Sequence, residues 1–135
     1  RSVSFTLNLM LFNKMPGLFD SAKIVDQGPH EFRRCVQRLM LSFGYQAFSV
    51  DSSGDGGGDL HCEKNGENWI IQCKWKKKGT VDDSAVMEVL EARQIYDTHH
   101  AILVTNTKLS EKAIKLITNF FKLIGQNSTN IINFF

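Results

Sequence analysis

The chain has 135 residues, of which 42% are hydrophobic, 10% aromatic and 22% charged. This length and composition are typical of one globular domain and exclude disordered and fibrous proteins. The net charge of +2 is too small to indicate a nucleic-acid partner by itself, and the apolar runs are too short for a membrane span.

Cysteine usage bears on the compartment. Cys35, Cys62 and Cys73 form no CxxC pair and are odd in number, which argues against a disulfide framework and a cysteine-based zinc site. We therefore expect an intracellular, reducing compartment, with the cytoplasm favoured. Residues 1–19 contain no acidic residue, which leaves a mitochondrial targeting segment as the alternative.

The first third of the chain predicts a lead-in and a helix. Residues 3–12 partly alternate, which fits a strand or a short helix. Pro29 suits the first turn of a helix, and Gly44 ends it. One face of this helix carries apolar residues at helical spacing: Phe32, Val36, Leu39, Met40 and Phe43. We expect residues 1–28 to be a lead-in or extra strand and residues 29–135 to form the domain.

The remaining chain alternates strands with helices. A strand at 45–50 precedes a glycine-rich loop at 51–58, and two strands flank Asn65-Gly66, which suits a type I′ hairpin turn. A helix over 82–96, capped by Asp82, Asp83 or Ser84, leads to a strand at 100–105 that is apolar enough for burial on both faces. Ser110 caps an apolar helix over 114–124, and residues 130–135 fit a last strand. This order predicts an α/β fold with a mixed β-sheet flanked by helices.

The hairpin register brings three polar side chains together. If Asn65-Gly66 is a two-residue turn, Asp59 faces Gln72, and Lys74 lies on the same face as a diagonal neighbour of Asp59. Carboxylate and amide oxygens are ligands that Mg²⁺ prefers, and the backbone carbonyl of Cys73 is a further candidate ligand. The Lys74 ammonium could stabilise the negative charge that develops on the phosphate during hydrolysis. Spacing alone fits a structural Asp59–Lys74 ion pair about equally well.

The flanking segments favour a site. Glycines at 54 and 56–58 let a backbone approach a ligand closely. On the other side, Lys76, Lys77 and Lys78 follow Trp75, a combination that suits phosphate contacts and stacking on a base or sugar. We therefore expect these four residues to bind nucleic acid.

These residues also carry a family resemblance. The run Ser53-Gly54-Asp55-Gly56-Gly57-Gly58-Asp59-Leu60, the hairpin, and Ile71-Gln72-Cys73-Lys74-Trp75 resemble the Mrr-type catalytic domain of type IV restriction endonucleases, in the PD-(D/E)xK nuclease superfamily. The likeness runs from the helix at 29–43 to residues 110–114. It implies a restriction-endonuclease-like fold with an αβββαβ core and a DNA endonuclease that uses Mg²⁺ or Mn²⁺.

The resemblance also assigns residues. It implies that Asp59 binds the metal, that Gln72 stands where other superfamily members have Glu, and that Lys74 is the motif lysine. Asp55 matches the first Asp of the family loop, where it would shape that loop or bind a second ion.

One departure from the family lies in the first helix. Family members show Phe-Glu where this chain has Phe32-Arg33. The nearby carboxylate, Glu31, is a further candidate, but one helical residue is a rotation of about 100°, so it does not simply substitute. The departure motivates an alternative, a catalytically degenerate module that binds nucleic acid without cleaving it. The apolar helix at 114–124 leaves a homodimer or a purely structural or regulatory role open.

Overall fold

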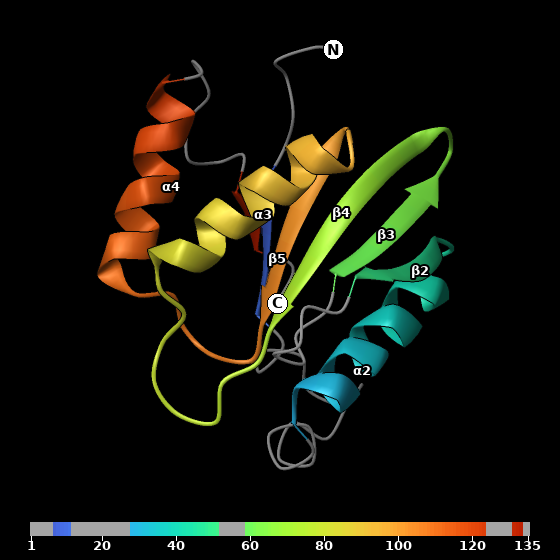
Figure 1. Cartoon of the computed structure of the whole chain (residues 1–135), viewed down its shortest axis with the longest axis horizontal. Coiled ribbons are helices and arrows are strands. Elements are labelled where there is room, and N and C mark those ends of the chain that lie inside the picture. Colours follow the sequence, from blue (N-terminus) through green and yellow to red (C-terminus); the bar gives the residue numbers. More distant parts are fainter. Residues whose placement is uncertain (1–6, 12–27, 52–58, 124–130, 134–135) are drawn as a thin grey trace.

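The computed structural model describes residues 7–11, 28–51, 59–123 and 131–133. In these ranges the elements are β1 (Leu7–Leu11), α2 (Pro29–Ser42), β2 (Gln46–Asp51), β3 (Asp59–Lys64), β4 (Glu67–Lys74), α3 (Asp83–Ile95), β5 (His100–Thr105), α4 (Glu111–Leu123) and β6 (Ile131–Asn133). The described strands form a six-stranded sheet in the order β2-β3-β4-β5-β1-β6. Helix α2 covers one face, and α3 and α4 cover the other (Figure 1).

The sheet is mixed, as predicted. Strands β2, β3 and β4 pair antiparallel, because short connections join them, whereas β4, β5, β1 and β6 pair parallel. The run from α2 to β5 has the predicted αβββαβ order. Residues 7–11, within the segment predicted as a strand or a short helix, form a strand between β5 and β6.

Helix α2 packs its apolar face against the sheet. Pro29 occupies its first turn, and Phe32 and Val36 are both 0% exposed. Burial of side chains of this size contributes about 1.5–3 kcal/mol each. The helix ends at Ser42, and the chain turns at Gly44, whose φ is +89°. Phe43, predicted on the apolar face of this helix, instead follows the last helical residue and is 41% exposed.

The hairpin between β3 and β4 has the predicted turn. Asn65 and Gly66 have φ values of 55° and 80°, which a type I′ turn requires at both central residues. The register is also the predicted one and pairs every residue from Lys64–Glu67 to Asp59–Gln72. The loop at 52–58 that precedes β3 lies outside the described residues.

The second core layer lies between α3, α4 and the opposite sheet face. Asp82 caps α3, accepting a hydrogen bond from the Ser84 backbone N–H at 3.1 Å. Strand β5 is buried on both faces from Ala101 to Thr105, as its sequence predicted. Ser110 caps α4, which starts at Glu111, before the predicted Ile114. No helix in the described ranges has the length and apolarity to cross a membrane.

Candidate active site

The hairpin register brings Asp59, Gln72 and Lys74 to one end of β3 and β4. Asp59 pairs with Gln72, and pleating puts Lys74 on the same face as Gln72. Gln72 is 8% exposed, and 21% of the Lys74 side chain is exposed. Cys73, the residue between them, projects into the core on the α2 side and pairs with Val104 of β5. The three polar side chains therefore gather on the sheet face that α3 partly covers.

Glu88 of α3 contacts two of these residues. Its Oε2 accepts a hydrogen bond from Gln72 Nε2 at 2.7 Å and lies 2.6 Å from Lys74 Nζ. Glu88 is not among the site residues predicted from the sequence. A signal was present, because Glu88 lies three residues after Ala85 and four before Ala92, both on the buried side of α3. An acidic residue bordering a sheet-facing stripe is a candidate for a polar contact with the sheet.

The oxygen of the Gln72 amide, Oε1, does not share the contact that Nε2 makes with Glu88. Gln72 Oε1 is buried and has no hydrogen-bond partner in the part of the chain that the structure describes. Such a group is costly to bury unless something binds it. Because amide and carboxylate oxygens are the donors that Mg²⁺ and Mn²⁺ take, a cation held by Gln72 Oε1 and Asp59 fits this chemistry. The described residues contain no group of three His, Cys, Asp or Glu side chains placed to hold a metal ion.

Charges on the α2 side also act near the site. Burial raises the pKa of the Cys73 thiol, and the negative charge of Asp59 raises it further, whereas Arg33 lowers it. Arg33 donates a hydrogen bond from Nη1 to Ser49 Oγ of β2 at 2.5 Å. Arg33, at the position where the resemblance implies a Glu, is therefore tied to the neighbouring strand.

The remaining carboxylate candidates are Glu31 and Asp55. Glu31 lies 2.8 Å from Arg38 Nη2 and 3.7 Å from Arg34 Nη1, so its carboxylate is paired with arginines of its own helix. Glu31, one residue before Phe32, therefore forms ion pairs along α2. Asp55 lies outside the described residues.

The lysine segment after β4 is anchored to the end of β5. Lys76, Lys77 and Lys78 are exposed. Asn106 Nδ2 donates to the Lys76 carbonyl at 2.8 Å, and Lys76 N–H donates to Asn106 Oδ1 at 2.8 Å. Trp75 is half-buried and packs against the α2-side core, so part of its ring is occupied within the protein.

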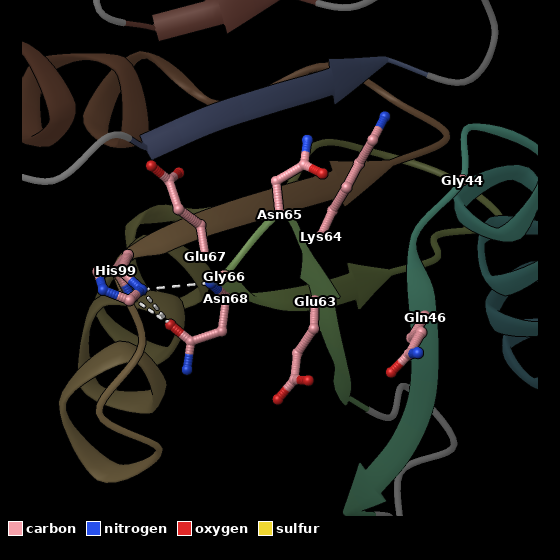
Figure 2. A pocket seen from close by; sticks show the side chains of 9 residues that line it. All are labelled: Gly44, Gln46, Glu63, Lys64, Asn65, Gly66, Glu67, Asn68 and His99. Carbon is pink, nitrogen blue, oxygen red and sulfur yellow. Dashed lines mark hydrogen bonds between the residues drawn. The ribbon is translucent and has the colours of Figure 1, made fainter.

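A pocket of about 470 Å³ lies at the other end of the hairpin. Figure 2 shows that Lys64 and Glu67 point to one side of the hairpin, and Glu63 and Asn68 to the other. His99 Nδ1 accepts a hydrogen bond from Asn68 N–H at 3.2 Å. The lining residues are Gly44, Gln46, Glu63, Lys64, Asn65, Gly66, Glu67, Asn68 and His99. None of them is a predicted site residue.

Comparison with known proteins supplies the family. Residues 24–134 match the Mrr_cat family model, described as a restriction endonuclease. No curated protein and no solved structure matches the chain significantly. The match spans α2, the hairpin, α3, β5 and α4. It confirms the resemblance seen in the sequence and the restriction-endonuclease-like fold.

Proposed function

Because the chain belongs to the Mrr_cat restriction endonuclease family, we propose that it is a metal-dependent endonuclease that hydrolyses DNA phosphodiester bonds with Mg²⁺ or Mn²⁺. In this proposal the Asp59 carboxylate, Gln72 Oε1 and the Cys73 backbone carbonyl hold the ion. A bound divalent cation would polarise a phosphoryl oxygen and acidify a water molecule.

The observation that carries the proposal is the buried Gln72 Oε1, which has no hydrogen-bond partner among the described residues, opposite Asp59 and two residues from Lys74. An amide oxygen left in this state is better explained by a ligand than by folding alone. The Lys74 ammonium, on the same face, is suited to orient the attacking water and to stabilise charge that develops on the phosphate.

Substrate binding is assigned to the lysine segment. Lys76, Lys77 and Lys78 project from a backbone that Asn106 fastens to β5. Ammonium groups on an ordered segment beside the site suit the phosphate backbone of DNA, whose binding releases counterions and depends on salt. The half-buried Trp75 packs against the core beside this segment, and we propose that it contributes to nucleic-acid binding there.

A second candidate function has its own support. Arg33 stands where the family has Glu and is bonded to Ser49, and Gln72 is neutral, so Asp59 is the one carboxylate among the three proposed ligands. A site with so little negative charge suits a module that binds nucleic acid without cleaving it. That module predicts salt-dependent DNA binding with no metal-dependent cleavage.

Nicking of supercoiled plasmid distinguishes the two. The assay is run with Mg²⁺, with Mn²⁺ and with EDTA, on the wild type and on Asp59→Asn, Lys74→Ala and Glu91→Gln. Glu91→Gln is the matched control, because Glu91 is an exposed acid of α3 outside the site. We expect metal-dependent nicking that falls at least about 100-fold in the two site variants and is unchanged in the control.

The contrary outcomes are equally specific. Undiminished nicking by folded Asp59→Asn protein contradicts the site. Salt-sensitive DNA binding without nicking in either metal supports the degenerate module. Circular dichroism of each variant checks that it is folded.

A further inference from the structure

Glu88 joins two proposed site residues through one atom. Its Oε2 lies 2.7 Å from Gln72 Nε2 and 2.6 Å from Lys74 Nζ. The helix that carries it is held firmly, because Val86 and Val89, on either side of it in the chain, are both 0% exposed in the core. We propose that Glu88 is a positioning residue that orients the Gln72 amide and the Lys74 ammonium for the reaction. This inference rests on the proposed function.

Glu88 sets which way the Gln72 amide faces. The oxygen and nitrogen ends of a glutamine side chain have nearly the same shape, so neighbouring groups decide which way it faces. A carboxylate only accepts hydrogen bonds, and therefore Glu88 selects Nε2. The amide oxygen is then directed away from α3, and Gln72 Oε1 is indeed buried without a partner among the described residues. Glu88 thereby presents that oxygen for metal binding.

Glu88 also holds the lysine. A lysine side chain has four rotatable bonds, and fixing it in one arrangement costs up to about 2 kcal/mol of rotamer entropy. The contact with Glu88 Oε2 restricts Lys74 before substrate arrives. Because one oxygen atom serves both partners, a change at Glu88 disturbs Gln72 and Lys74 together.

Charge complementarity explains why this pair is an amide and a carboxylate. With Glu in place of Gln72, two carboxylates would meet at the position of the 2.7 Å hydrogen bond, and they would repel. Exchanging the two side chains, by Gln72→Glu together with Glu88→Gln, restores a donor opposite an acceptor. The exchange is therefore a test of the pair that does not depend on cleavage.

The experiment compares the wild type with Glu88→Gln, Glu88→Ala, Gln72→Glu and the exchange variant, with Glu91→Gln as the matched control on the same helix. Mn²⁺ binding without DNA is measured by electron paramagnetic resonance, and thermal unfolding is measured without metal. Nicking kinetics are resolved into kcat and KM.

We expect Glu88→Gln and Glu88→Ala to weaken Mn²⁺ binding about 10- to 100-fold, as loss of a ligand-orienting partner does. They should lower kcat while the KM for DNA changes less than about twofold. Gln72→Glu should lower the melting temperature of the metal-free protein, and the exchange variant should regain it. Glu91→Gln should match the wild type in all three measurements.

The outcomes separate this inference from the proposed function. Wild-type Mn²⁺ affinity and kcat in both Glu88 variants overturn the positioning role, even if their melting temperatures fall. An exchange variant that is no more stable than Gln72→Glu overturns the pairing argument. A wild-type protein that binds no Mn²⁺ overturns the proposed function and this inference with it.

Discussion

Asn106 offers a test of how the lysine segment is positioned. Its side chain makes two hydrogen bonds of 2.8 Å with the Lys76 backbone, one as donor and one as acceptor. A net neutral hydrogen bond contributes about 0.5–1.5 kcal/mol, and these two are exposed to water. We therefore expect Asn106→Ala to lower the free energy of unfolding by roughly 1–2 kcal/mol, measured by urea denaturation.

The same substitution should weaken DNA binding because the Lys76 backbone is no longer held in place, and not because a positive charge is lost. If Lys76 is no longer held before binding, fixing its backbone costs about 1–2 kcal/mol when DNA arrives. This predicts an increase in Kd of about tenfold. The slope of log K against log salt should not change, because the same ammonium groups meet the phosphates. Fluorescence anisotropy of a labelled duplex over a range of KCl concentrations measures both quantities.

Two controls bound this prediction. Lys76→Ala removes a charge and should reduce the magnitude of the salt slope by about 0.9 for each lost phosphate contact. Asn119→Ala, at an exposed asparagine of α4, should change neither stability nor binding. Wild-type stability and affinity in Asn106→Ala would contradict this positioning role, and so would a salt slope that falls as that of Lys76→Ala does.

Three further predictions concern the scaffold. Gly66→Ala should destabilise the protein by about 1–2 kcal/mol in urea denaturation, because φ at Gly66 is +80°, a conformation that alanine adopts only with strain. An added Cβ meets no atom within 4 Å, so the expected loss comes from the backbone and not from a clash. Unchanged stability would contradict the assigned turn. Burial raises the pKa of the Cys62 thiol to about 12 and also raises the pKa of the Cys73 thiol. We therefore expect neither thiol to react with iodoacetamide at pH 8 until the protein unfolds. Modification of the native protein at the rate of a free thiol would contradict this prediction. The hydrogen bond from the Ser84 side chain lowers the pKa of Asp82, so the helix cap stabilises the protein fully above the ordinary carboxyl pKa of about 3.9 and less as the pH falls through the lowered value. The melting temperature of Asp82→Ala should lie below that of the wild type at pH 6 and converge with it under strong acid, and a constant difference down to pH 2 would argue against the cap.

The hairpin was predictable because its determinants are local. Asn65-Gly66 tolerates the positive φ values of a tight turn, and a two-residue turn leaves one register for the strands. Since strand side chains alternate with a period of two, the juxtaposition of Asp59 with Gln72 follows by counting. The burial of β5 was likewise readable from its composition, because a run of apolar residues has no face suited to water.

Other features depended on how the elements pack. The sequence of α3 shows which residues border its buried side, but the contact of Glu88 with both Gln72 and Lys74 follows from where the helix lies over β4. Asn106 and Lys76 are 30 residues apart and meet because β4 and β5 are parallel neighbours. The same limit applies to Phe43, whose helical spacing continues the apolar pattern one residue past Ser42, where the helix ends.

The order of elements, the hairpin register and the three polar residues at its end could therefore be read from the chain alone, because turn chemistry and side-chain alternation act over a few neighbouring residues. Tertiary packing, by contrast, sets which helix carboxylate contacts Gln72 and Lys74 and which side chain holds the lysine segment. Those contacts join residues distant in the chain, and their geometry is set by the packing of whole helices and strands against a shared core.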